Sequence, residues 1–233
     1  TGSRLPRRFL HGRDGLGALG IPVVATRSLG LKSTPLILDR LRTGALDEIV
    51  ALGPLTNVAH AYAAAPRLLR QLRGITVMAG VMVDRAEAGT TEFNLASDPA
   101  AARCLLGSQV PLRWVPMNVA AAVQFPHDAI DRFGAAHARS QLARTIAQLM
   151  AYAAKARGVA AAVVPDAVAF VLALDPALGR WRQVRLALTG TARSGRLRIE
   201  AGVPNAQVCD GLHETRVTER LWTLWTRLVT TNQ

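Results

Sequence analysis

The sequence predicts an α/β fold with a mostly parallel sheet, helices on both faces and a small C-terminal hairpin. Strand-like apolar runs alternate with helix-like segments along the chain, and β-α-β alternation favours parallel strands covered on both sides. The chain has 233 residues, and 50% of them are hydrophobic, which is enough for one full core. With no long linker in the sequence, we expect a single domain over residues 1–233.

The first half of the chain supplies three predicted strands. They are the short apolar runs 48–52, 75–78 and 111–115, which have the length and composition of buried strands. The segments before and between them have apolar residues at helical spacing: 35–46, 58–64 and 98–106.

The second half is predicted to be mostly helical before it ends in a hairpin and a helix. Helices are expected over 128–133 and 136–157. Residues 183–189 and 196–200 alternate around a Ser-Gly pair, which predicts an antiparallel hairpin. The amphipathic pattern over 214–229 predicts a closing helix.

The formal net charge of +12 raises the question of a polyanionic partner. The chain has 26 arginines and two lysines, spread along its length without a basic block, and only 5% of its residues are aromatic. Biased arginine usage therefore explains the charge better than nucleic-acid binding, so we expect no nucleic-acid partner.

The cellular compartment is predicted from the two cysteines and from the absence of membrane-spanning and signal-peptide patterns in the sequence. Cys104 and Cys209 have no metal-site or disulfide spacing, so we expect buried free thiols in a reducing, cytoplasmic setting. No apolar stretch is long enough to span a membrane. The chain begins at Thr1 and its first residues lack a signal-peptide core, so we expect a processed chain or a fragment.

The most informative polar groups follow the predicted strand 75–78. Glu92 and Asn94 lie in the loop after this strand, and the carboxyl ends of parallel strands are where open α/β sheets bind ligands. A carboxylate and a carboxamide two residues apart suit the hydroxyls of a sugar. The alternatives are that Glu92 is a solvated loop acid and that Asp98, ahead of Pro99, is a helix N-cap.

Six fragments of the chain stand in the order seen in inosine-uridine preferring nucleoside hydrolases, and together they resemble that family over essentially the whole chain. They are His11–Gly17, Ala51–Asn57, Met78–Gly80, Glu92–Asn94 with Asp98-Pro99, Pro116–Val119, and Asp166–Ala169 with Asp175-Pro176.

This resemblance implies a Rossmann-like nucleoside hydrolase fold and calcium-dependent hydrolysis of the N-glycosidic bond of ribonucleosides. It makes Asp166 a calcium-ligating aspartate, and Ala120, where a threonine is usual, the donor of a backbone carbonyl to the metal. Glu92 and Asn94 would bind ribose hydroxyls, and His11 would lie beside the base. The alternatives are that Asp166 is a helix N-cap and that His11 is a loop histidine bonded to backbone.

Three departures from the family pattern bear on activity. Nothing before His11 resembles the family's first strand and aspartate-rich loop, which supplies most calcium ligands and the carboxylate thought to activate water. Pro165 stands where the family has its catalytic histidine, and proline has no proton to give. Ala86 lies where the family has a Gly-Asn pair. We therefore expect that no catalytic group is retained and that hydrolysis is impaired.

Two hypotheses follow. The chain is either the larger, N-terminally truncated part of a nucleoside hydrolase, or a degenerate relative that binds ribonucleosides without cleaving them. In both cases we expect a ribonucleoside ligand and a homo-oligomer. A missing strand would also expose a sheet edge, which predicts pairing with another chain or poor solubility.

Overall fold

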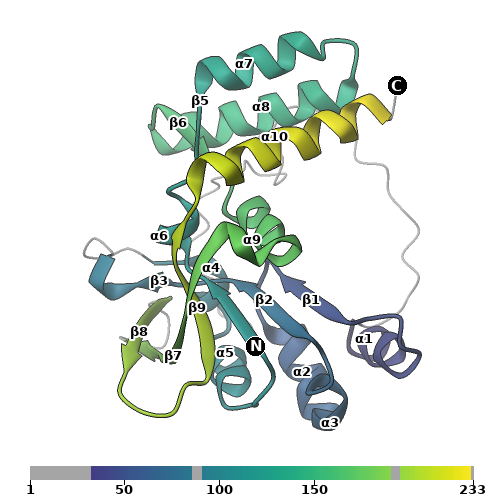
Figure 1. The fold of residues 1–233 in the computed structure, drawn as a ribbon, viewed down its shortest axis with the longest axis vertical. Helices are drawn as coiled ribbons and strands as arrows, with labels where there is room; N and C mark the ends of the chain where they lie inside the picture. The colour runs from purple at the N-terminus through teal and green to yellow at the C-terminus, as the bar shows by residue number, and fades with distance from the viewer. Residues whose placement is uncertain (1–32, 86–90, 190–194, 232–233) are drawn as a thin grey trace.

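The computed structural model describes residues 33–85, 91–189 and 195–231. Figure 1 shows a central sheet with helices on both sides. The helices are α1 Ser33–Arg42, α2 Thr56–Ala64, α3 Pro66–Leu69, α4 Phe93–Ser97, α5 Pro99–Leu106, α6 Met117–Ala120, α7 His127–Ala136, α8 Gln141–Arg157, α9 Pro165–Leu174 and α10 Glu214–Thr231, with 3-10 turns η1 Val83–Arg85 and η2 Pro176–Leu178. The strands are β1 Glu48–Ala51, β2 Gly74–Met78, β3 Val81–Met82, β4 Leu112–Val115, β5 Gln124–Pro126, β6 Ala161–Val163, β7 Gly179–Thr189, β8 Arg196–Glu200 and β9 Ala206–Leu212.

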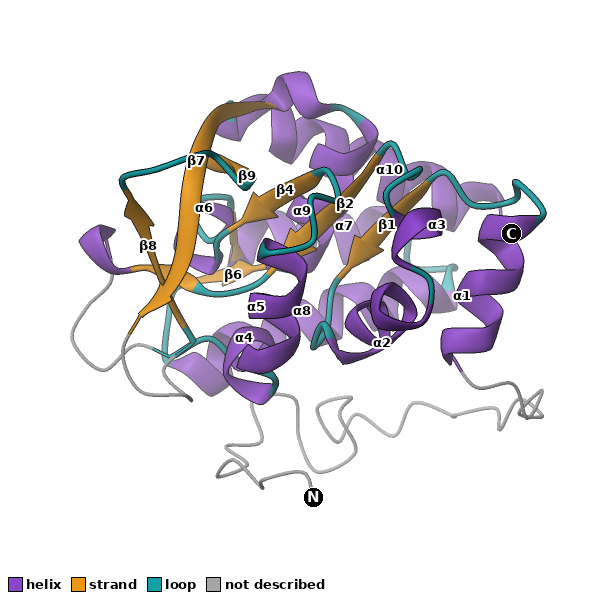
Figure 2. Ribbon diagram, turned by 90° about the horizontal axis from the view of Figure 1, so that it is seen from below, coloured by secondary structure: helices purple, strands orange, loops and turns teal. Residues whose placement is uncertain are grey.

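The main sheet has seven strands among the described residues, in the order β1-β2-β4-β9-β7-β8-β3. Strands β1, β2, β4 and β9 are parallel, and β7 is antiparallel to both β9 and β8. The predicted α/β class and the parallel strands are confirmed. The sheet is mixed, however, because the C-terminal strands join it instead of forming a separate small hairpin (Figure 2).

Strand β9 was not predicted. It lies between β4 and β7 and so connects the parallel half of the sheet to the antiparallel half. The predicted hairpin itself is confirmed, since β7 and β8 pair antiparallel with Thr189 opposite Arg196. Strand β9 contains Asp210 and Gly211, and both residue types are depleted in strands. The sequence pattern therefore did not indicate a strand here.

Two apolar cores lie on opposite faces of the sheet. One packs α2 and α5 against the sheet through residues such as Leu105, Ile75 and Trp114. The other gathers Val115 and Cys209 of the sheet with α6, α9 and α10.

Helices α7, α8 and α10 form a further layer beyond α9 (Figure 1). Aromatic rings hold α10 in this layer: Phe125 contacts Trp222 edge-on at a centroid distance of 5.1 Å, and Phe133 lies 5.1 Å from the same ring. The predicted helix 136–157 is wrong at its start. Helix α7 continues to Ala136, and α8 begins only after Ser140, whose hydroxyl accepts a hydrogen bond from the Ala143 N–H.

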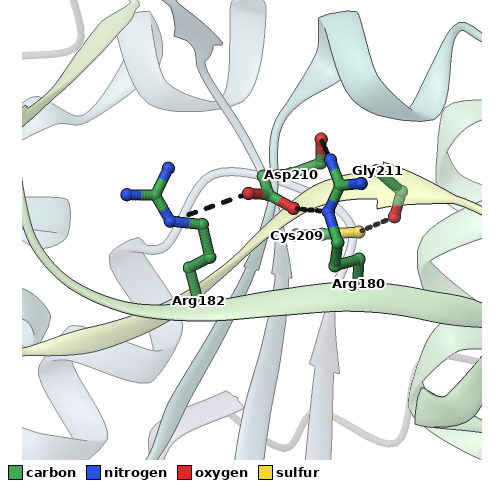
Figure 3. A network of polar contacts seen from close by, with 5 residues as sticks. All are labelled: Arg180, Arg182, Cys209, Asp210 and Gly211. Carbon is green, nitrogen blue, oxygen red and sulfur yellow. Dashed lines mark hydrogen bonds and ion pairs between the residues drawn. The ribbon is translucent and has the colours of Figure 1, made fainter.

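The arginines of β7 are partly neutralised across the sheet, as Figure 3 shows. The Arg180 Nε lies 2.6 Å from the Asp210 carboxylate of β9, and the Arg182 Nε lies 3.7 Å from its other oxygen. The neighbouring Cys209 thiol is buried, and burial raises its pKa to about 11. The prediction of buried thiols is confirmed for Cys209 and wrong for Cys104, which is exposed.

None of the helices among the described residues is long and apolar enough to cross a membrane.

Candidate functional site

Glu92 is a buried carboxylate that holds three backbone N–H groups. Its Oε1 accepts from the Asn94 N–H at 2.7 Å, and its Oε2 accepts from Leu95 at 2.8 Å and from Gly80 at 2.7 Å. The side chain is therefore the N-cap of α4 and also ties that helix to the turn after β2. The alternative of a solvated loop acid is wrong, because Glu92 is only 7% exposed.

Asn94 connects the ends of two neighbouring strands. Its Nδ2 donates to the Met78 carbonyl at the end of β2 at 3.0 Å and to the Leu52 carbonyl just after β1 at 3.2 Å. Both partners are acceptors, which fixes the orientation of the amide. The structure thus places Glu92 and Asn94 where the sequence predicts them, at the carboxyl ends of parallel strands.

Asp166 lies in the first turn of α9, beside this pair. Its carboxylate is near enough to Glu92 to influence the ionisation of that residue: burial is the main cause that raises the pKa of Glu92, and the charge of Asp166 raises it further, against the lowering effect of the three backbone N–H groups. The alternative of Asp166 as a helix N-cap is wrong, because Val164 is the N-cap of α9. Asp166 is exposed.

Pro165 occupies the first position of α9, where a proline is well tolerated because no backbone donor is needed there. Its ring has no group that could donate a proton to a departing base. Pro165 therefore suits the start of α9, but it cannot take the role of the histidine that the family pattern has at this position.

Ala120 ends the short helix α6, which follows β4. The residue is buried, and its carbonyl accepts a hydrogen bond from the Val123 N–H at 3.3 Å. Helix α6 is joined to the turn after β2, because the Met117 N–H donates to the Gly80 carbonyl at 2.8 Å. Gly80 therefore contacts both Glu92 and α6, a linking role that its place in the Met-Ala-Gly fragment did not reveal.

His11 and the residues of its motif lie outside the described residues, as do Ala86 and Thr90. Within the described ranges, no three His, Cys, Asp or Glu side chains gather to hold a metal ion. Calcium takes six to eight oxygen ligands. Asp166 and the Ala120 carbonyl could supply two of them, so the described residues do not complete a calcium shell.

Asp98 is confirmed as a helix N-cap. Its Oδ1 accepts from the Ala101 N–H at 3.0 Å, and its Oδ2 accepts from the Thr56 hydroxyl at 2.6 Å. The two fragments 51–57 and 98–99 are thus held together by a structural contact. Burial alone would raise the pKa of Asp98, but these hydrogen bonds outweigh it and keep the pKa below its usual value of 3.8.

Replacing Asp98 with asparagine is expected to flatten the acid limb of the stability curve. Because the folded-state pKa is lowered, the stabilisation from the Asp98 carboxylate is present above the unfolded pKa and is lost as the pH falls through the folded one. Urea unfolding between pH 2 and 5 checks this, with Thr56→Val as the control that removes one hydrogen bond. Equal acid limbs in the wild type and Asp98→Asn would contradict it.

The chain is similar to known proteins in sequence and in fold. The family model "Inosine-uridine preferring nucleoside hydrolase" matches residues 2–219. Among curated relatives, the pyrimidine-specific ribonucleoside hydrolase RihA of Enterobacter sp. (strain 638) is 30% identical over 144 residues, which are 60% of this chain and 45% of the relative. The probable uridine nucleosidase 1 of Oryza sativa subsp. japonica is 29% identical over 119 residues, covering 50% of this chain and 37% of that one.

Solved structures show the same fold. The purine-preferring ribonucleoside hydrolase from Gardnerella vaginalis superposes with a TM-score of 0.85 at 22% identity, covering 95% of this chain and 73% of that one. The matched regions are between about a third and a half of the length of the first curated relatives. Since the family model extends over nearly the whole sequence, the chain belongs to the inosine-uridine preferring nucleoside hydrolase family.

Proposed function

We propose that this chain carries the ribose-binding part of a ribonucleoside N-ribohydrolase. The observation that carries the proposal is the amide of Asn94. Both of its N–H groups are bound to the carbonyls of Met78 and Leu52, whereas its Oδ1 has no hydrogen-bond partner among the described residues. An amide held in this way offers an oriented acceptor to a hydroxyl donor.

Glu92 supports the same chemistry. A carboxylate has about four acceptor positions, and the three backbone N–H groups leave capacity on Oε1, whose one donor among the described residues is the Asn94 N–H. Ribose hydroxyls are donors that fit such acceptors. The base would be the leaving group, and the negative charge of Asp166 would favour the positive charge that develops on the sugar in an oxocarbenium-like transition state.

The proposal includes calcium because of the family to which the chain belongs. Asp166 and the Ala120 carbonyl are the described residues that would ligate it, and the ion would supply a Lewis acid that holds hydroxyls and water. The remaining ligands would have to come from groups outside the described residues. We therefore propose a site that the described residues, 33–85, 91–189 and 195–231, form only in part.

Hydrolysis by the chain alone is expected to be impaired. Pro165 offers no proton at the start of α9, and the loss of a general acid costs about 100- to 10,000-fold in rate. Incubating the chain with inosine and calcium should give no hypoxanthine above the protein-free rate. Calcium-dependent release of hypoxanthine would refute the impairment.

Calorimetric titration with calcium should show no submicromolar binding, and such binding would indicate a complete site.

A second candidate function is ribonucleoside binding without cleavage, favoured by Pro165 and by the incomplete ligand set. The two candidates differ in one result. Inosine that binds but is recovered intact, with and without calcium, supports the binding protein, whereas slow turnover supports the hydrolase.

Self-association stays a prediction, which light scattering after gel filtration checks.

A further inference from the structure

A polar cleft of about 520 Å³ lies at the amino-terminal edge of the main sheet. Its polar lining residues are Arg73, Gln109, Arg113, Gln183, Asn205 and Gln207. Strand β2 separates this edge from the candidate ribose site: Gly74 begins the strand and Met78 ends it. Four residue steps of a parallel strand span about 13 Å. The cleft is therefore distinct from the site formed by Glu92 and Asn94.

Three of these side chains form a row across the sheet. Arg113 of β4 is in register with Gln207 of β9, and Gln207 is in register with Gln183 of β7. Residues in register on neighbouring strands lie on the same face, about 5 Å apart. Central strands of an α/β sheet are normally apolar on both faces. A polar row here is thus unusual for the position, and its three side chains line the cleft.

The charge of the cleft is positive. Its lining residues include two arginines and no acid among the described residues. The carboxylate of Glu48 forms ion pairs with both guanidinium groups: it lies 3.5 Å from Arg113 and 3.8 Å from Arg73. These are long ion pairs, and a single carboxylate cannot neutralise two arginines. One positive charge is left over at the cleft.

The carboxamides add unused hydrogen-bonding groups. Neither Gln183 nor Gln207 makes a side-chain hydrogen bond to another described residue. Each carboxamide offers two N–H donors and one acceptor oxygen. Donors and acceptors beside two guanidinium groups match a molecule that carries both an anion and hydroxyl or ring nitrogen groups.

We propose that this cleft binds a small phosphomonoester of the size of a nucleoside monophosphate. Guanidinium groups favour phosphate because their planar N–H donors match its oxygens. Arg73 and Arg113 would contact the phosphate, and Gln183 and Gln207 would contact the polar body of the molecule. The volume lies within the range of small-molecule sites, about 300 to 1,000 Å³. The proposal is independent of the ribose site.

The test is calorimetric titration of the wild-type chain with 2′,3′-dideoxyadenosine 5′-monophosphate, 2′,3′-dideoxyadenosine and inorganic phosphate at low salt. Both nucleoside probes lack the two hydroxyls that the candidate ribose site is proposed to bind. The monophosphate is expected to bind at least tenfold more tightly than the nucleoside, and more tightly than phosphate because the carboxamides contribute. Binding should weaken at 0.5 M NaCl, because salt screens exposed charges. No binding of the monophosphate, or equal binding of the nucleoside, would overturn the proposal.

Variants locate the site. Arg73→Gln and Gln183→Glu alter exposed side chains of the cleft, and each is expected to weaken monophosphate binding at least tenfold. Arg227→Gln removes the same charge from an exposed position on α10 and should leave the affinity unchanged. Equal weakening in Arg227→Gln would contradict the cleft as the site.

Discussion

Replacing Gly195 with alanine is expected to destabilise the fold by about 2–4 kcal/mol, of which roughly 1–3 comes from overpacking and about 1 from the left-handed backbone. Gly195 has φ of 60°, and a Cβ added there would lie 2.4 Å from the Glu92 carbonyl oxygen and 2.7 Å from the Glu92 nitrogen. Both are backbone atoms that cannot rotate away. The substitution would therefore push against the residue that caps α4.

Gly158→Ala is the matched control for this variant. Gly158 has φ of 66°, nearly the same conformation, but nothing lies within 4 Å of its added Cβ. Its cost should be the backbone strain alone, about 1 kcal/mol. Urea unfolding of both variants measures the difference. If Gly195→Ala were as mild as Gly158→Ala, the close approach of Gly195 to the Glu92 backbone would be wrong.

The second large effect is expected for Glu92→Ala. The substitution leaves three backbone N–H groups, those of Gly80, Asn94 and Leu95, without their acceptor. An unsatisfied buried donor costs about 1–3 kcal/mol, so a total of about 3–5 kcal/mol is expected after partial solvation. Glu219→Gln, on the exposed face of α10, is the control and should change stability by less than about 0.5 kcal/mol.

The pH dependence of Glu92→Gln provides a separate check. Burial raises the folded-state pKa of Glu92 above the usual 4.5. The folded state therefore holds the proton more tightly, and this part of the stability is present below the unfolded pKa and is lost as the pH rises through the folded pKa. Urea unfolding at several pH values from 4 upward should show wild type losing stability relative to Glu92→Gln. A constant difference between the two would contradict the raised pKa.

Much of the parallel half of the sheet could be predicted from the sequence, because its strands are short apolar runs between helices with helical spacing. Strands β1, β2 and β4 and helices α2 and α5 are confirmed to within a residue or two. Strand β9 could not be predicted, because its partners β4 and β7 are far apart in sequence and its pattern is interrupted by Asp210 and Gly211.

For the candidate site, too, only a part could be predicted from the sequence. The place of Glu92 and Asn94 at strand ends follows from the alternation of elements, and the structure agrees. The partners of these side chains do not follow from it, since Gly80, Leu52 and Met78 reach them only in the folded chain. The functional roles of Glu92, Asn94, Asp166 and Ala120 stay predictions.

The central claim is that acceptors fixed by the strand ends bind the hydroxyls of a ribose. Calorimetric titration with inosine and with 2′,3′-dideoxyinosine tests it most directly, because the two ligands share the base and differ in the two hydroxyls. We expect inosine to bind at least tenfold more tightly, equivalent to about 1.4 kcal/mol or more. Equal affinities for the two ligands, or no inosine binding at millimolar concentration, would contradict the claim.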